Sequence, residues 1–509
     1  MFAQPAVGVL LTLLVPLAAL GQVRATAEVE GRWGLIDTLG HWRIPPVWPG
    51  PLRYSEGLAE VTDTLPGPQP LRGYLDTAGR WAIPAAFLLT EPFRDGLAIV
   101  ARPDTTAIDT LLQTVGDSVL KTPVYAPLRE VIDRTGQRVL GPPCTEFKHL
   151  GGGLLGAYDP TAKAWGVLTA AGDTLAPFRF SDARGLGSAT HLALAEADER
   201  WLLWHVPTRR ALTPARYRFI GPLAEGRCAV WDAEYNRWGA LNDQGHEAIP
   251  ALYRYLGDFG HGAAWASENL VGDDWALFCT REHDPASPYP LDLTGTWGLL
   301  DTLGRWVAPP TFTWVEGQSR ASRVPRATGS VVGQDSLLGA LLPSGSWALA
   351  PVVAARRVVA GRWVLTEDRQ NRLEARDAQG TRTLPPYPAY GLLQGGSELA
   401  HNLLTVNQGR VPDPDDPECP DPLLEPGTWY FYDLRTGQHT GPGFNWIEPF
   451  AHGFAPVFRG EVYSCGGEPT EVGVWGYANR AGQLGIGLSY SAVRPFQDVA
   501  ATLPLSDED

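Results

Sequence analysis

Carboxylate side chains recur at one place in a repeating D-x-x-G pattern, and recurring carboxylates can act as catalytic acids or as calcium ligands. The aspartates at this place are Asp37, Asp76, Asp133, Asp301 and Asp377. In other copies the same place holds Asn242, Asn479, Thr169 and Leu342. A site that depends on charge would not tolerate this variety, whereas a type I turn accepts it, with Asp at its first position and Gly at its fourth. We therefore interpret these residues as turn residues.

The other catalytic or cofactor motifs lack the context that their chemistry needs. The segment 151–156 matches G-x-G-x-x-G, but a dinucleotide site requires a helix after it, and no helical pattern follows. His261 and His452 each precede a glycine, at a place that holds Glu56 in the first copy, so we interpret them as polar turn residues. No G-x-S-x-G, H-E-x-x-H or Walker sequence occurs. The sequence thus predicts no catalytic residue, no cofactor and no enzyme activity.

Metal binding is not predicted either. The five cysteines form no C-x-x-C pair and have no histidine at zinc-ligand spacing. An acidic cluster between Asp413 and Asp421 lacks the D-x-D-x-D-G loop of calcium sites, and its prolines favour an extended, solvated loop.

Tryptophan is the residue type that best suits ligand binding here, because a large aromatic ring can pack against a ligand. Most of the 19 tryptophans recur at fixed places in the repeat, which indicates packing between units. Four others lie outside those places and are the candidate ligand surface: Trp48, Trp231, Trp265 and Trp314.

An internal repeat organises the chain from residue 31 to about residue 505. Ten copies open with a Trp-Gly-like pair, have Asp or a substitute four residues on, and close with Gly after seven, while a degraded copy near Trp201 keeps only the second half of the repeat. Eleven units open near residues 33, 72, 129, 165, 201, 238, 297, 338, 373, 430 and 475. The residues that define the repeat best are Trp33, Gly34, Asp37, Gly40, Asp76, Gly79, Asp133, Gly136, Trp165, Gly172, Trp238, Gly245, Trp297, Asp301, Gly304, Trp475 and Gly482.

Each unit is predicted to contain three short strands. The Trp-Gly segment alternates as a half-buried strand does. A return strand follows the D-x-x-G turn and stops at Ile-Pro-Pro, because proline cannot donate to a ladder. A third strand has the pattern G-L-A-x-V. We predict an all-β tandem array with very little helix, either an open curved array, which three strands per unit favour, or propeller-like closed rings, whose blades have four strands.

These residues resemble the WG-repeat family of bacterial β-repeat proteins, whose units have the pattern W-G-x-I-D-x-x-G, then I-P-P, then F-x-x-G-L-A-x-V. The match spans nearly the whole chain and is strongest in the units that open at residues 33, 72, 238 and 297. The resemblance implies an exported or envelope protein that binds or scaffolds, and it implies no shared catalytic activity.

Three units carry about 20 additional residues, at 101–128, 266–295 and 401–428. Insertions at one structural position project from one edge of a repeat array, often its binding edge. Residues 506–509 form an acidic tail, so the predicted repeat region is 26–505.

Residues 6–20 are uncharged and apolar, which is typical of a secretory signal, and small residues permit cleavage after Gly21 or after Ala25. We expect a cleavable signal peptide at 1–25, export to the periplasm, cell surface or medium, and no transmembrane segment in the mature chain. The net charge of −15 argues against nucleic acid as a partner. The sequence therefore favours a non-enzymatic binding or scaffold protein with a protein or polysaccharide partner. The alternatives are a carbohydrate-binding protein and a glycan-acting hydrolase with an unrecognised carboxylate pair.

Overall fold

The structure is a computed structural model, and it describes residues 23–63, 70–115, 118–270, 295–315, 330–334, 337–353, 356–360, 363–367, 373–377, 380–385, 389–390, 401–408, 428–463 and 470–502. Within these residues every regular element of any length is a β-strand, which confirms the all-β prediction. In the same part of the chain, no helix is long and apolar enough to cross a membrane. The predicted signal segment lies outside the described residues up to position 22.

The strands form small antiparallel sheets of four strands each, and the second sheet shows the pattern. It runs in the order β4 (Tyr54–Ser55), β5 (Leu58–Thr62), β6 (Arg72–Leu75) and β7 (Trp81–Phe87). One sheet of eight strands joins two such units, so the described strands make eleven units. The unit count predicted from the sequence is confirmed, but each unit has four strands rather than three.

The strands can be grouped by their position in the sheet. The first strands are β44 (Ala492–Val493), β4, β8 (Leu89–Thr90), β12 (Glu146–Gly151), β16 (Asp182–Gly185), β20 (Tyr217–Ile220), β24 (Tyr255–Leu256), β28 (Trp314–Val315), β32 (Arg356–Ala360), β36 (Ala389–Tyr390) and β40 (Trp446–Ile447). The second strands are β1 (Val23–Val29), β5, β9 (Leu97–Val115), β13 (Leu154–Asp159), β17 (His191–Ala195), β21 (Arg227–Asp232), β25 (Ala263–Ser267), β29 (Ser330–Gln334), β33 (Trp363–Glu367), β37 (Leu403–Gln408) and β41 (Phe454–Tyr463).

The third strands contain the opening positions of the repeat, and the fourth strands follow the D-x-x-G turn. The third strands are β2 (Arg32–Ile36), β6, β10 (Ser118–Asp133), β14 (Ala164–Thr169), β18 (Trp201–His205), β22 (Arg237–Asn242), β26 (Trp297–Asp301), β30 (Leu337–Leu341), β34 (Leu373–Asp377), β38 (Thr428–Asp433) and β42 (Thr470–Asn479). The fourth strands are β3 (Trp42–Trp48), β7, β11 (Arg138–Leu140), β15 (Thr174–Phe180), β19 (Arg210–Ala211), β23 (Glu247–Tyr253), β27 (Trp306–Phe312), β31 (Trp347–Val353), β35 (Gly380–Thr383), β39 (Gln438–Phe444) and β43 (Leu484–Tyr490). The Ile-Pro segment lies in β3, β7 and β23.

The additional strand arises from the segment that the sequence presented as a single third strand. In the first unit this segment folds back at Glu56-Gly57, where both residues have positive φ, 52° and 80°. A turn of this kind joins the short strand β4 to β5 as a tight hairpin. The fourth strand also differs from the prediction, because β7 continues through Pro84. It lies at the edge of its sheet, where a proline need not donate a hydrogen bond.

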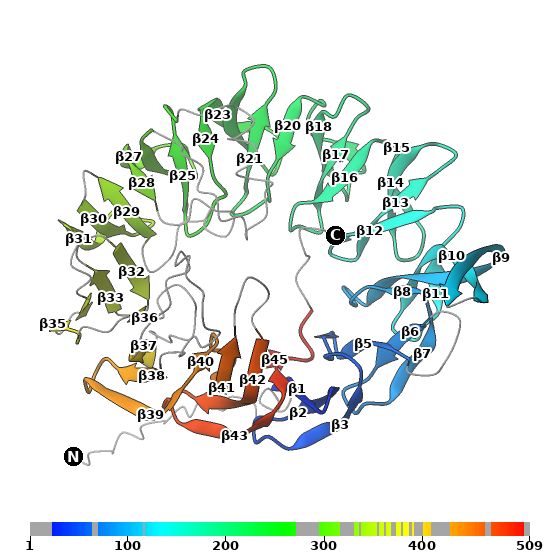
Figure 1. The fold of residues 1–509 in the computed structure, drawn as a ribbon. Coiled ribbons are helices and arrows are strands. Elements are labelled where there is room, and N and C mark those ends of the chain that lie inside the picture. Colours follow the sequence, from blue (N-terminus) through cyan, green and yellow to red (C-terminus); the bar gives the residue numbers. More distant parts are fainter. Residues whose placement is uncertain are drawn as a thin grey trace, which may run out of the picture.

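The sheets are arranged around a ring (Figure 1). The hairpin that ends each sequence unit contributes the first two strands of the next sheet, so neighbouring units are joined by shared sheets. The last unit does the same for the first: β44 pairs with β1, and β45 (Gln497–Asp498) also pairs with β1. The ring is therefore closed, as in the propeller-like alternative of the sequence analysis. The open array was favoured there because only three strands were counted in each unit, and that preference was wrong.

Contacts between neighbouring sheets repeat around the ring, including at the closure. Trp81 packs edge-on against Trp48 of the preceding sheet with ring centroids 5.6 Å apart, and Trp42 packs in the same way against Tyr490 at 5.8 Å. The closing glycine of the second unit, Gly79, lies against Ile44, and Gly40 lies against Ile486 in the last sheet. The last and first sheets thus pack together through the same contacts as the first and second sheets.

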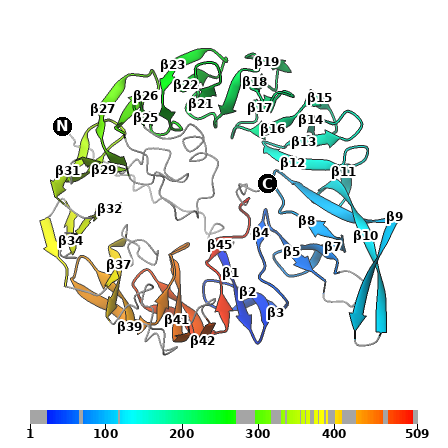
Figure 2. The ribbon, with the colours of Figure 1, turned by 45° about the horizontal axis from the view of Figure 1, so that its top comes forward.

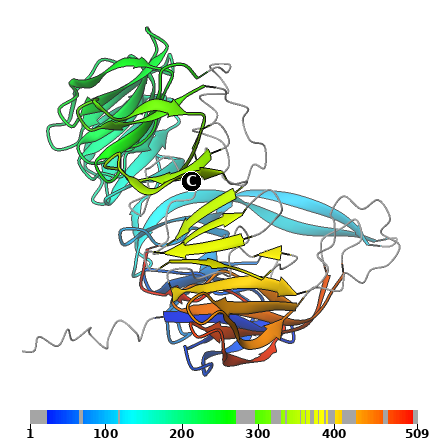
Figure 3. The same ribbon diagram turned by 90° about the vertical axis from the view of Figure 1, so that its left-hand side faces the viewer.

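The ring has two faces. The turns between first and second strands and between third and fourth strands lie on one face, which we call the turn face. The connections between second and third strands and the crossovers to the next sheet lie on the other, which we call the insertion face. All three predicted insertions fall in connections between a second and a third strand, on the insertion face. Figure 2 shows that the long pair β9 and β10 extends beyond its sheet, and Figure 3 shows this ribbon leaving one side of the ring.

The structure corrects the description of two predicted insertions. Residues 101–128 are not a loop but the antiparallel ribbon of β9 and β10, paired from Ala101↔Arg129 outward. Residues 403–408, assigned to the third insertion, form the buried strand β37. Residues 271–294 and 409–427 of the other insertions, and the tail 506–509, lie outside the described residues. Residues 23–25, assigned to the signal peptide, belong to β1.

Candidate functional site

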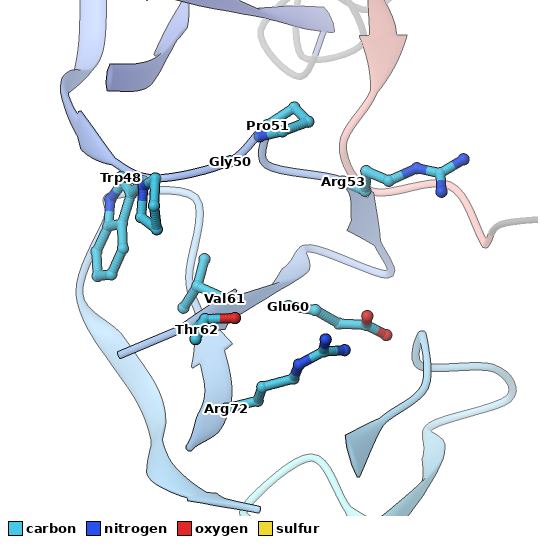
Figure 4. A pocket seen from close by; sticks show the side chains of 9 residues that line it. Trp48, Gly50, Pro51, Arg53, Glu60, Val61, Thr62 and Arg72 are labelled. Atoms are coloured by element: carbon cyan, nitrogen blue, oxygen red, sulfur yellow. The ribbon is translucent and has the colours of Figure 1, made fainter. Parts of the chain in front are cut away.

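A small pocket lies on the insertion face, between the crossover from the first to the second sheet and the ends of β5 and β6 (Figure 4). Its volume is about 180 Å³. Nine residues line it: Trp48, Pro49, Gly50, Pro51, Arg53, Glu60, Val61, Thr62 and Arg72.

The local sequence explains why this crossover arches over a cavity. Pro49 and Pro51 have no backbone N–H, so these positions cannot donate to the adjacent strand, and their fixed φ favours an extended path. Gly50 lies between them, and a Cβ atom added to it would have no other atom within 4 Å. Trp48 closes one end of the arch, and the edge-on contact with Trp81 holds its ring. The walls contributed by the crossover are therefore largely apolar.

Glu60 is the unusual residue of the pocket. It pairs with Tyr74, two positions after the opening position of the third strand. The corresponding residues of the other ten sheets are all uncharged: Thr26, Ile99, Gly156, Ala193, Ala229, Trp265, Val331, Leu365, Thr405 and Pro456. A carboxylate has thus been placed where the repeat otherwise uses residues suited to a core.

The environment of Glu60 disfavours its charge. Burial raises the pKa of Glu60 to about 7. The nearby carboxylate of Glu91 adds to the rise in pKa, while Arg72, Arg53 and Arg94 oppose it. The Oε1 atom is enclosed and accepts no hydrogen bond from the described residues. An enclosed acceptor without a donor is unfavourable and uncommon, so this atom calls for an explanation beyond folding.

The charged end of the pocket contains groups of both signs. The Glu60 carboxylate and the Arg72 guanidinium point toward one another, with Arg53 on the crossover side (Figure 4). Both arginines act on the Glu60 carboxylate through their charge and oppose the rise in its pKa. With a pKa near 7, Glu60 can accept a hydrogen bond when ionised and donate one when protonated. Glu60 is the only carboxylate among the nine lining residues, so they do not supply a pair for glycoside hydrolysis.

The four candidate tryptophans have different outcomes. Trp48 lines the pocket. Trp231 and Trp265 are only 5% and 3% exposed, so they pack within the ring and offer no open ring face at the surface. Trp231 stacks on Trp238 and donates from Nε1 to Asn236 Oδ1 at 3.1 Å. The side chain of Trp314 lies outside the described residues.

Four of the repeated aspartates, Asp37, Asp76, Asp133 and Asp301, occupy turns, and the turn after Asp377 lies outside the described residues. Asp37 Oδ1 accepts hydrogen bonds from the backbone N–H groups of Leu39 and His41, at 2.9 and 3.0 Å. Asn242 and Asn479 make the same pair of contacts with their amide oxygens. Seven of the predicted closing glycines have φ between 72° and 86°: Gly40, Gly79, Gly136, Gly172, Gly245, Gly304 and Gly482.

The Trp-Gly pairs serve packing. Trp238, Trp297 and Trp475 are buried, and Trp33 and Trp165 are half-buried. A Cβ at Gly34 would lie 2.5 Å from the Ile44 carbonyl oxygen, so glycine lets the fourth strand approach. In the tenth unit the opening position belongs to Trp429 rather than Tyr430, since Trp429 pairs with Phe444 as Trp33 pairs with Trp48.

Sequence reasoning missed Glu60, although a signal was present. The pattern G-L-A-x-V has a variable position, and Glu60 is the charged residue at that position of an otherwise apolar strand. Among the described residues, no group of three or more His, Cys, Asp or Glu side chains is arranged to hold a metal ion.

A family model described as WG containing repeat matches residues 33–62, 73–101, 238–269 and 297–317. No curated protein matches the chain. Among solved structures, the computationally designed Ika8 protein is 11% identical, with a TM-score of 0.21, and the match covers 76% of this chain and 93% of that one. BamB from Moraxella catarrhalis is 12% identical, with a TM-score of 0.23 and coverage of 70% and 92%. The tricorn protease is 10% identical, with a TM-score of 0.25; the match covers 90% of this chain and about half, 52%, of that one. Similarities this low indicate nothing about function.

Proposed function

The chain carries WG-containing repeats at four places, and from this premise we propose that it is a non-enzymatic interaction scaffold that binds a macromolecular partner on the insertion face of the ring. The observation that supports the proposal most directly is the position of the additional residues. All three insertions occur in the same type of connection, and the one that is described, β9 with β10, extends as a ribbon from that face. Additions confined to one side of a repeat array are typical of a binding side.

Export to the bacterial envelope is part of the proposal, supported by the apolar segment 6–20. Cleavage after Ala25 would remove three residues of β1, among them Val23 and Arg24, which pair with β45. Cleavage after Gly21 leaves β1 whole. We therefore favour Gly21 as the last residue of the leader.

Partner capture from an envelope extract of the source organism tests the scaffold function. The ribbon can be shortened by replacing residues 103–127 with an Asn-Gly turn, because Arg102 and Leu128 are paired and a two-residue turn can connect them. We expect the full chain to retain a saturable partner and the shortened chain to lose it.

The matched control changes the turn face. Leu39 and Leu303 are 72% and 59% exposed there, so Leu39→Ser with Leu303→Ser should leave capture unchanged. Capture that survives ribbon removal but is lost with the turn-face substitutions would contradict the proposal.

A further inference from the structure

We propose that the pocket beneath the Trp48–Arg53 crossover binds one neutral, hydroxylated six-membered ring, of the size of a single sugar unit. The inference deepens the proposed binding function and rests on it, because it assigns a ligand class to a site on the insertion face. Four features of the pocket lead to this class of ligand.

The first feature is size. A cavity of about 180 Å³ corresponds to the liquid volume of about six water molecules. One six-membered ring with its hydroxyl groups fits that volume, whereas an oligosaccharide or a folded peptide segment does not. A longer glycan would therefore place a single unit in the pocket and leave the rest outside.

The second feature is the distribution of apolar and polar walls. The crossover supplies the rings of Trp48, Pro49 and Pro51 and, at its far end, Arg53. The strand side supplies Glu60, Thr62 and Arg72 with one apolar residue, Val61. A hydroxylated ring matches this division, because its C–H groups can lie against apolar rings while its hydroxyls meet polar groups. A purely apolar ligand would leave the polar wall unpaired, at a cost in free energy.

The third feature is the pair of enclosed polar atoms without partners. Glu60 Oε1 lacks a donor, and Trp48 Nε1 lacks an acceptor, within the described residues. A hydroxyl group can donate or accept, so a polyol suits both kinds of group. The Nε1 atoms of Trp204 and Trp297, which do not line this pocket, are also enclosed without an acceptor within the described residues, so the two atoms support the proposal only together with the size and lining of the pocket.

The fourth feature is charge. Arg53 and Arg72 would repel a cationic ligand, and ionised Glu60 would repel an anionic group placed directly against its carboxylate. Since burial holds the pKa of Glu60 near 7, the sum of charges at this end changes with pH around neutrality. An uncharged ligand is compatible with either state.

Saturation-transfer NMR on the full chain tests the proposal with D-glucose and myo-inositol as neutral probes, cyclohexanol as a ring with one hydroxyl, and D-glucuronate as an anion. We expect saturation transfer to the two neutral polyols and much less to cyclohexanol and glucuronate. Glu60→Ala should weaken binding of the polyols by about tenfold or more, because a hydrogen bond to a charged group is lost. Glu247→Ala, at an exposed glutamate in β23, is the matched control and should have no effect.

Glu60→Gln preserves the shape of the side chain and keeps the test valid if the alanine variant is unstable. The affinity of the unaltered chain should change as the pH crosses about 7, with Arg72, Arg53, Arg94 and Glu91 as the charged groups around Glu60. The glutamine variant should show no such change. Absence of transfer to both polyols, or transfer that Glu60→Ala leaves intact, would overturn the proposal. Because free polyols are the probes, this result does not depend on whether the ribbon captures a macromolecule.

Discussion

Gly73 in β6 should be among the positions that tolerate a side chain least. A Cβ atom there would lie 2.5 Å from Ile83 O, 2.7 Å from Ala85 N and 2.8 Å from Pro84 C. All three atoms belong to the backbone of β7, so no side-chain rotation relieves the contact. Restoring an ordinary separation of about 3.5 Å to the oxygen would move β7 by about 1 Å. Overpacking of this kind costs about 1–3 kcal/mol, and Gly73→Ala should destabilise the protein by that amount.

The matched control is Gly487→Ala in β43, where the added Cβ meets no atom within 4 Å. Both substitutions reduce the backbone freedom of the unfolded chain equally, by up to about 1 kcal/mol, so their difference isolates the contact. Thermal and urea unfolding, followed by circular dichroism, should give a lower midpoint for Gly73→Ala by several degrees, at about 2–4 °C per kcal/mol for cooperative units of 150–250 residues. Equal midpoints for the two variants would refute the steric explanation of the Trp-Gly pair.

Four other measurements follow from the structure. The hydrogen bond from Thr135 and bonds from backbone N–H groups lower the pKa of Asp133, against a smaller effect of burial. The ionised Asp133 side chain should therefore stop stabilising the fold as the pH falls below about 4. Unfolding measured at several pH values should show less acid sensitivity in Asp133→Asn. Burial raises the pKa of Glu60 to about 7, so ionisation should destabilise the fold progressively from about pH 4 to 7; Glu60→Gln should be the more stable protein at pH 8, and equal stabilities there would contradict the assigned burial. Removing residues 491–509 should accelerate hydrogen exchange in β1, while removing only 503–509 should not. N-terminal sequencing of the exported protein should begin at Gln22, and a start at Thr26 would show that β1 is shorter than described.

The sequence predicted the elements that depend on neighbours in the chain. Asp37 and Gly40 interact within one turn, where Gly40 N donates to Asp37 O at 2.9 Å, so their spacing alone was sufficient. The third strands also lie where the Trp-Gly pairs predicted them. The predicted half-buried alternation was wrong, however, because β2, β6 and β26 each contain three or more consecutive buried residues. The strand count was wrong because β4 has only two residues, too few to show alternation. Its hairpin with β5 requires positive φ at Glu56, a residue that rarely adopts it, so the turn was hard to recognise.

The ring and the pocket depend on contacts between distant residues, which no local pattern records. Closure depends on Ala492 and Val493 pairing with Glu28 and Ala27. Trp265 lies outside the repeated tryptophan positions and was predicted to contribute to a ligand surface, yet it pairs with Leu299 within β25, whose five residues are all buried. The environment of Glu60 depends on a crossover from the preceding sheet and on arginines from several segments.

Closure by the last strands gives synthesis of this chain a particular order. β1 is among the first strands to leave the ribosome, whereas β44 is made only near the end of the chain, roughly 20 to 90 seconds later at ordinary rates of translation. Throughout that interval one edge of β1 has no partner strand, and an open edge is a template for pairing with other chains. A prematurely terminated chain never acquires the missing strands. The pairing of β44 and β45 with β1 therefore distinguishes complete molecules from incomplete ones, because only a fully translated chain can cover the open edge of β1. Shortened products keep this edge exposed as a surface that chaperones or proteases can recognise.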